Sequence, residues 1–288
     1  MLRRVLRRVA RLVRPAPPAP PRPLATTPPP VSPAARKRRK LDRVRPLLRD
    51  DVPVIATPGH FDCLTPELRA QFGVADTDNV SAHEYDEIAR GLIAKYAGGL
   101  ILDCGAGLRP TYYDDVVNYE IVPYPTTDVL GVGERLPFRD GVFDAVFSLN
   151  VLEHVRDPFA CAAEIARVMK PGGELYCVVP FLQALHGYPH HYYNMTHQGL
   201  KALFDRYLSV ERQEVSPSGL PIWTLTHTLH RWASVLSEPT RTAFLKMRVA
   251  DLIGDPAQYL TLPAVTEVPA EVNFELASTT TLFARKAA

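Results

Sequence analysis

A short loop with two glycines, at residues 105–107, is the part of the chain whose residue types point most directly to chemistry. It comes after three aliphatic residues and one acid, Asp103, which is the pattern of a strand buried on both faces of a parallel sheet. Glycine lets backbone N–H groups approach a ligand closely where such a strand gives way to a helix. A plain tight turn would have the same residues, so the prediction depends on the motifs further along the chain.

Four further motifs come after the glycine loop in order. Residues 136–138 read Leu-Pro-Phe, residues 143–148 read Phe-Asp-Ala-Val-Phe-Ser, residues 151–155 read Val-Leu-Glu-His-Val, and residues 170–173 read Lys-Pro-Gly-Gly. Together with the loop, this series resembles the class I S-adenosylmethionine-dependent methyltransferases, in the methyltransferase type 11-like subgroup. The resemblance runs from about Leu100 to Phe204, with a looser match at the C-terminal strand.

The nearest alternative is a dinucleotide-binding Rossmann domain. That fingerprint needs a third glycine at position 110 and an acid about twenty residues further on. Position 110 is a proline, so the methyltransferase interpretation is favoured.

The resemblance implies S-adenosylmethionine as the cofactor, bound outside the carboxyl ends of the strands. It implies that Asp103 and the glycine loop hold the amino-acid end, and that Glu120 accepts hydrogen bonds from the ribose hydroxyls. The family usually has an aspartate for the adenine amine where this chain has Val132, so backbone groups or Glu134 must replace it. An ordinary strand-end acid remains the alternative for Glu120. The predicted cofactor-binding residues are Asp103, Gly105, Ala106, Gly107, Glu120, Val132, Gly133, Glu134 and Asn150.

Methyl transfer is an in-line displacement at the sulfonium methyl, so the protein mainly holds the nucleophile about 3 Å from that methyl. A general base helps only when the acceptor is a hydroxyl or a protonated amine. Histidine suits that role because it titrates near neutral pH, and residues 180–196 contain three histidines and three tyrosines. The alternative is that these histidines pin the segment by hydrogen bonds. The predicted catalytic residues are His154, His186, His190 and His191, and no metal site is predicted.

Runs of apolar residues and alternating apolar and polar residues predict seven strands. They lie at residues 100–104, 116–122, 128–132, 142–149, 174–179, 207–215 and 271–285. Helices are predicted at 81–96 from a capping box, at 111–115 where the crossover is short, and at 157–169 after an Asp-Pro helix start. Right-handed crossovers then give an α/β fold, a doubly wound, mostly parallel seven-stranded Rossmann-like sheet with helices on both faces.

The first 49 residues differ in charge from the rest of the chain. They hold 15 Lys and Arg residues against one acid, whereas residues 50–288 hold 18 against 30. Residues 1–14 have the pattern of a basic amphipathic helix, which could lie on an anionic membrane, act as a transit peptide or stay frayed. The proline-rich stretch after it cannot pack a core. We therefore predict a disordered tail at 1–50 and a methyltransferase domain at 51–288, with a helical cap at about 217–270.

Net charge and cysteine usage limit the classes of function that the chain can have. An acidic body argues against a nucleic-acid substrate, because phosphate contacts need a basic face. Four scattered cysteines without metal-ligand spacing are typical of free thiols in a reducing cytoplasm. We expect a cytoplasmic methyltransferase that acts on a small-molecule, lipid or glycan acceptor, with peripheral contact to an anionic membrane through residues 1–14. The alternative is a catalytically silent domain that binds S-adenosylmethionine as an interaction partner or sensor.

Overall fold

The computed structural model describes residues 32–75, 81–187, 190–282 and 285. The predicted amphipathic helix at residues 1–14 lies outside the described residues. All helices and strands of the described residues belong to one compact unit that begins at Pro33.

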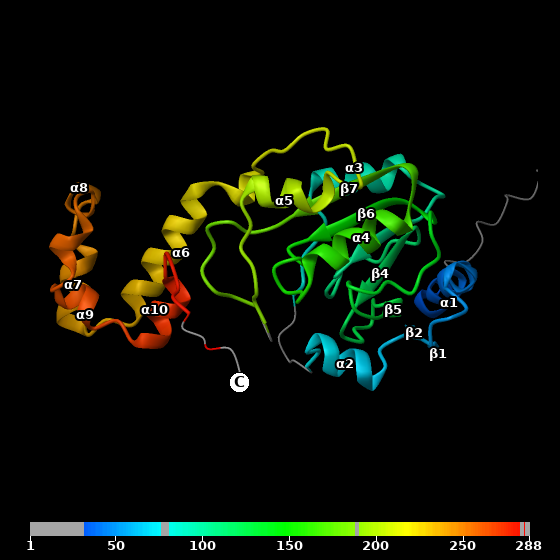
Figure 1. The fold of residues 1–288 in the computed structure, drawn as a ribbon, viewed down its shortest axis with the longest axis horizontal. Helices are drawn as coiled ribbons and strands as arrows, with labels where there is room; N and C mark the ends of the chain where they lie inside the picture. The colour runs from blue at the N-terminus through cyan, green and yellow to red at the C-terminus, as the bar shows by residue number, and fades with distance from the viewer. Residues whose placement is uncertain (1–31, 76–80, 188–189, 283–284, 286–288) are drawn as a thin grey trace, which may run out of the picture. The chain divides into compact units, whose positions relative to one another are not determined.

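This unit contains one seven-stranded sheet (Figure 1). Its strands are β1 (Ile55–Ala56), β2 (Phe61–Asp62), β3 (Ile101–Cys104), β4 (Val116–Glu120), β5 (Val129–Leu130), β6 (Phe143–Leu149) and β7 (Met169–Val178). Their order is β1-β2-β5-β4-β3-β6-β7, and every neighbouring pair is parallel except β1 with β2. The predicted doubly wound, mostly parallel Rossmann-like fold is confirmed.

Alternate residues of the central strands enter two different hydrophobic clusters. Leu102 of β3 and Val117 of β4 belong to one cluster, whereas Ile101 and Val116 belong to the other. Because successive side chains of a strand point to opposite faces, the two clusters lie on opposite faces of the sheet. Both faces are therefore covered, which is why these strands read as continuous apolar runs rather than as alternating ones.

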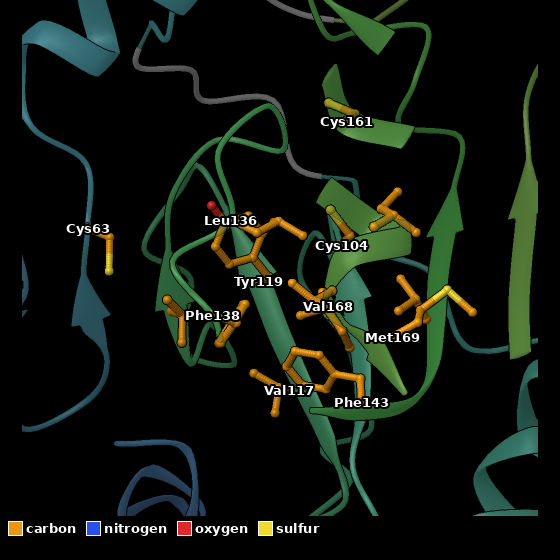
Figure 2. Close-up of a cluster of buried hydrophobic side chains, with 14 of the residues drawn as sticks. Cys63, Cys104, Val117, Tyr119, Leu136, Phe138, Phe143, Cys161, Val168 and Met169 are labelled. Carbon is orange, nitrogen blue, oxygen red and sulfur yellow. The ribbon is translucent and has the colours of Figure 1, made fainter. Parts of the chain in front are cut away.

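Helices α1 (Pro33–Val44), α4 (Pro158–Val168) and α5 (His197–Phe204) contribute to the first cluster, and α3 (Glu87–Lys95) to the second. Figure 2 shows the first cluster, in which Tyr119 and Phe138 pack edge to face with ring centroids 5.8 Å apart. Helix α4 begins as predicted, since the Asp157 side chain accepts from the Ala160 N–H at 3.0 Å. The predicted helices on both faces are thus present.

The last two predicted strands are wrong. Residues 207–215 form no strand, and residues 270–276 form helix α10 (Ala270–Leu276). Neither segment pairs with the edge strands β1 and β7 in the described residues, and Val215 is 66% exposed. The count of seven is reached instead by β1 and β2, which are only two residues long each and too short to give a periodic signal.

Two predicted helices also differ from the structure. Helix α3 begins after Asp86, whose side chain caps the Ala89 N–H, and not at the capping box predicted from Ser81. Residue 81 instead accepts from the Leu108 N–H at 2.9 Å, so residues 81–82 run beside the glycine loop. The short helix predicted at 111–115 is absent, because those residues form a loop whose polar side chains bond α1.

The folded unit starts earlier than residue 51, which corrects the predicted boundary. Helix α1 and the turn η1 (Arg45–Leu47) lie within the stretch assigned to the disordered tail, yet Leu41 and Val44 are core residues. Lys40 is 1% exposed and donates to Asp128 Oδ2 at 2.8 Å, with its ammonium 3.6 Å from the centre of the Tyr112 ring. Composition classed this stretch as a basic cluster, but three of its residues face inward.

The C-terminal part of the chain is helical. It comprises α6 (Pro221–Ser234), α7 (Glu238–Leu245), α8 (Val249–Leu252), α9 (Pro263–Thr266) and α10, with short turns η2 (Pro217–Gly219) and η3 (Pro256–Tyr259). A separate small cluster, which includes Ala233, Phe244 and Val272, joins α6, α7, α9 and α10. Helix α2 (Pro66–Phe72) packs on the short strand β5 through Leu68. The role of residues 217–270 as a cap stays a prediction.

Among the residues that the structure describes, no helix has the length and apolar character needed to cross a membrane. All four cysteines are free thiols: Cys63, Cys104 and Cys161 are buried, and Cys177 is half-buried.

Candidate cofactor and acceptor site

The order of the strands creates a topological switch point beside β3. The chain passes from β3 to β4 and β5 on one side, and then crosses to β6 and β7 on the other. In open α/β sheets, ligands bind outside the carboxyl ends of the strands at such a switch point. The glycine loop comes directly after β3 and Asn150 directly after β6, so the predicted cofactor residues flank this point.

The glycine loop is fastened to the end of β4. The N–H groups of Gly105 and Ala106 both donate to the Tyr119 carbonyl, at 2.9 and 3.0 Å, and the Gly107 N–H donates to Glu120 Oε2 at 2.7 Å. The structure thus brings together the two halves of the predicted cofactor site, the loop and the ribose-binding acid. These three amides already have acceptors within the protein, and their hydrogen bonds fix the position of the loop relative to β4.

Neither glycine of the loop has room for a side chain. Gly105 has φ +79°, and a Cβ there would lie 2.5 Å from a methyl group of Val151. Gly107 has φ +62°, and a Cβ there would lie 2.5 Å from the Ser81 carbonyl oxygen. These backbone conformations favour glycine, and the close approach leaves no room for a larger residue.

Asp103 has partners that sequence reasoning missed. Its carboxylate is fully buried and accepts from the Tyr85 hydroxyl at 2.5 Å and from Arg109 at 2.8 and 3.2 Å. The Arg109 guanidinium also lies over the Tyr85 ring, 4.3 Å from its centre. Both carboxylate oxygens are therefore engaged by side chains of the protein itself. Arg109 lies six residues after Asp103, but nothing in that spacing predicts a buried pair.

Replacement of Asp103 by alanine is expected to lower the free energy of unfolding by about 3 kcal/mol, because Arg109 would keep a buried charge without its partner. Urea unfolding monitored by circular dichroism measures this change. Asp114→Ala is the matched control, since it removes the carboxylate of an exposed ion pair with Arg36 and should change stability far less. Equal losses in the two variants would contradict the importance of the buried pair.

The segment predicted for adenine lies beside the end of β3. Gly133 is close to Cys104, because a Cβ on Gly133 would be 3.9 Å from the Cys104 sulfur. The Val132 carbonyl accepts from the Tyr119 hydroxyl at 2.8 Å, and Glu134 Oε1 accepts from the Arg156 N–H at 3.0 Å. Val132 is buried in the apolar cluster beneath α2, so its side chain does not replace the polar group that the resemblance implies at this position.

Asn150 and Glu120 complete the predicted cofactor residues. Asn150 has φ +55°, a conformation that asparagine tolerates better than most residues, and its N–H donates to the Val178 carbonyl. Burial raises the pKa of Glu120, although the amides of Gly107 and Ile121 counteract it by donating to its carboxylate.

Three of the four predicted catalytic histidines converge. The ring centroids of His154 and His186 are 5.4 Å apart, those of His154 and His191 are 5.6 Å apart, and those of His186 and His191 are 4.3 Å apart. His190 differs, because its ring contacts the Gly73 carbonyl at 3.1 Å and packs on Tyr192. The backbone carbonyl of His190 still takes part, at 2.7 Å from His154 Nδ1.

Glu153 is a further residue of this cluster that sequence reasoning did not assign. It is fully buried, and neither carboxylate oxygen has a hydrogen-bond partner among the described residues. Burial raises its pKa to about 7, and Oε1 lies 3.8 Å from His154 Nε2. The only available sequence signal was its place directly before His154, which does not predict burial.

The comparisons with known proteins agree with this architecture. Residues 104–177 match the family model of the methyltransferase domain. An uncharacterized methyltransferase of Schizosaccharomyces pombe is 43% identical over 63 residues, which is 22% of this chain and 23% of that protein. The demethylmenaquinone methyltransferase of Mycolicibacterium vanbaalenii is 53% identical over 47 residues, which is 16% of this chain and 21% of that enzyme. The match thus spans under a quarter of these two relatives.

Among solved structures, the YcgJ protein of Bacillus subtilis aligns with a TM-score of 0.35 at 17% identity, covering 55% of this chain and 88% of that one. The family match shows a methyltransferase domain at residues 104–177, and the strand order is that of a doubly wound, mostly parallel sheet. S-adenosylmethionine is the cofactor expected of such a domain.

Proposed function

We propose that this protein transfers the methyl group of S-adenosylmethionine to a small-molecule, lipid or glycan acceptor. The observation that carries this proposal is the hydrogen bond from the Gly107 N–H to Glu120 at the switch point of the sheet. It holds the loop and the strand-end acid together where a nucleoside-containing ligand would bind.

The residues at the switch point of the sheet fit this cofactor. Glu120 can accept from ribose hydroxyls, since its two carboxylate oxygens have about four acceptor directions together and the backbone amides do not fill all of them. The absence of a Cβ at Gly105 and Gly107 lets the loop backbone lie close to the ligand. The bound cofactor supplies the electrophilic methyl group, and the protein binds and orients the reactants.

The histidine cluster is our candidate for the acceptor side. His154 and His186 each have Nε2 free of a hydrogen bond to the described backbone and are half-buried, so either could accept a proton from an acceptor hydroxyl. His190 suits this role less well, because its ring already contacts Gly73.

Exposed apolar side chains on the same segment support an acceptor with an apolar part. Phe181, Leu182 and Leu185 are each more than half exposed. The Leu182 carbonyl accepts from Thr224 Oγ1 at 2.6 Å, which ties this segment to α6, where Trp223 is also half exposed. Cytoplasmic location and membrane contact through residues 1–14 remain predictions.

Calorimetry with S-adenosylmethionine and S-adenosylhomocysteine tests the cofactor step. We expect the full chain to bind both, and Glu120→Gln to weaken binding at least about tenfold, since a charge-assisted hydrogen bond contributes about 1.5–3 kcal/mol. Glu271→Gln removes an exposed carboxylate from α10 and is the matched control. A folded wild-type protein that binds neither ligand would refute the proposal.

Turnover is tested separately, with deuterated-methyl S-adenosylmethionine and a cell extract. A mass shift of one labelled methyl in lipid or polar fractions would identify the acceptor class. Cofactor binding without any labelled product would favour the catalytically silent alternative.

A further inference from the structure

The group formed by Glu153, His154 and His186 has a second feature that methyl transfer does not require. One ligand atom from each residue can be chosen so that all three atoms lie within 4.8 Å of one another. Glu153 and His154 come after β6, whereas His186 comes from the segment after β7, so the fold joins residues 32 positions apart.

Both histidines present the same ring nitrogen to the group. His154 Nδ1 lies 2.7 Å from the His190 carbonyl, and His186 Nδ1 lies 2.9 Å from the Ala184 carbonyl. A carbonyl can only accept, so each Nδ1 carries the proton and each Nε2 keeps its lone pair. This is the arrangement of metal-binding histidines, whose other ring nitrogen donates to a backbone carbonyl or a carboxylate.

The third member, Glu153, has a buried carboxylate with no partner among the described residues. A buried carboxylate without a hydrogen bond or counter-charge is costly, and native structures pair such groups or place them on metals. The His154 ring beside it offers an unprotonated nitrogen at 3.8 Å, which cannot donate. A cation between the two would satisfy both groups.

Glycine at position 187 allows this approach. Its φ is +79°, and a Cβ there would collide with the His154 ring. His191 is packed against His186 but is engaged differently: Nδ1 accepts from the His186 N–H, and Nε2 contacts Asn194 Oδ1. His191 therefore borders the group without offering a free lone pair.

We propose that Glu153, His154 and His186 bind a divalent first-row transition-metal ion. Two imidazoles and one carboxylate are the ligand set of open zinc and iron sites, which leave positions for water or substrate. Zinc takes such ligands at about 2.0–2.2 Å, so the group contracts slightly on binding. This departs from the sequence-based expectation of a site without metal, and it does not rest on methyl transfer. An Nε2 atom that ligates the ion has no lone pair left to accept a proton, so an ion-bound His154 or His186 would not act as the base.

The test uses the full chain without a histidine tag, freed of metal with a chelator. Calorimetry with Zn²⁺ and elemental analysis after dialysis should give one bound ion per chain, and Co²⁺ should produce visible d–d absorption bands. Glu153→Gln and His186→Ala should each weaken Zn²⁺ binding at least about 100-fold, because loss of a direct ligand exceeds the 10–100-fold effect of an outer partner. Zn²⁺ should raise the melting temperature of the wild type but not of these variants.

His197→Gln is the matched control, since it removes an exposed histidine at the start of α5 and should leave Zn²⁺ binding unchanged. Circular dichroism of the metal-free variants reports folding, and Glu153→Gln retains side-chain volume if His186→Ala fails to fold. The proposal is overturned if the wild type binds no ion or if Glu153→Gln binds Zn²⁺ as tightly as the wild type. Cofactor binding measured on the same samples separates this outcome from failure of the proposed function.

Discussion

A chain that starts at Asp51 should fail to fold cooperatively, whereas a chain that starts at Pro33 should fold and bind S-adenosylmethionine like the full protein. The reason is that α1 and the turn after it supply core residues rather than a tail. Leu41, Val44 and Leu48 are each less than 9% exposed and belong to the main hydrophobic cluster.

The expected loss is large compared with the stability of a typical domain. Burying an aliphatic side chain contributes about 1.5–3 kcal/mol, and three such side chains would be removed together. Removing Lys40 also leaves Asp128 buried without its ammonium partner, which costs about 3–5 kcal/mol in comparable cases. The Tyr112 hydroxyl and the Asn118 N–H still donate to Asp128 and reduce that cost. The sum nevertheless falls within the range of a usual unfolding free energy, which is about 5–15 kcal/mol.

Thermal unfolding of the two shortened chains, monitored by circular dichroism, measures the effect. Within the full chain, Lys40→Ala should lower the melting temperature strongly, and Arg39→Ala should not, because Arg39 is an exposed residue of the same helix. If the chain from Asp51 melts at the temperature of the full chain, α1 is not part of the folded core.

The second large effect is expected from Gly105→Ala. The added Cβ would lie 2.5 Å from one methyl of Val151 and 2.7 Å from the other, so the segment after β6 must move away from the glycine loop. The backbone at φ +79° adds strain of about 1–2 kcal/mol for any residue with a side chain. Because the loop and that segment flank the switch point of the sheet, we expect at least about tenfold weaker S-adenosylmethionine binding as well as lower stability.

Gly172→Ala is the control that separates backbone strain from steric crowding. Gly172 has φ +78°, but a Cβ there meets no atom within 4 Å. This variant should lose only the strain energy and should bind S-adenosylmethionine like the wild type, as measured by calorimetry and urea unfolding. Equal cofactor affinity in the two variants would show that the contact with Val151 is unimportant for the site.

Much of the sheet could be predicted because the sequence patterns that indicate its longer strands are local. The aliphatic runs of β3, β4 and β6 reflect burial on both faces, and the Asp-Pro start of α4 is a direct capping signal. Strands β1 and β2 have two residues each and exist through pairing, β2 with β5 and β1 with β2. No local pattern in so short a segment can indicate a strand.

The sequence by itself indicated the class of the domain and the positions of the predicted binding residues. It could do so because the motifs mark the ends of strands, and the carboxyl ends of parallel strands meet at one edge of the sheet. The sequence also predicted that the glycine loop and Glu120 lie together, and the structure joins them by the hydrogen bond from the Gly107 N–H to Glu120. Only the tertiary structure decided that Lys40 and Arg109 are inward-facing partners of Asp128 and Asp103. It alone brought the Glu153 carboxylate to the histidine cluster without a partner among the described residues. The physical reason is that burial and charge pairing depend on which distant segments pack together, and a charged residue has the same sequence signature on the surface and in the core.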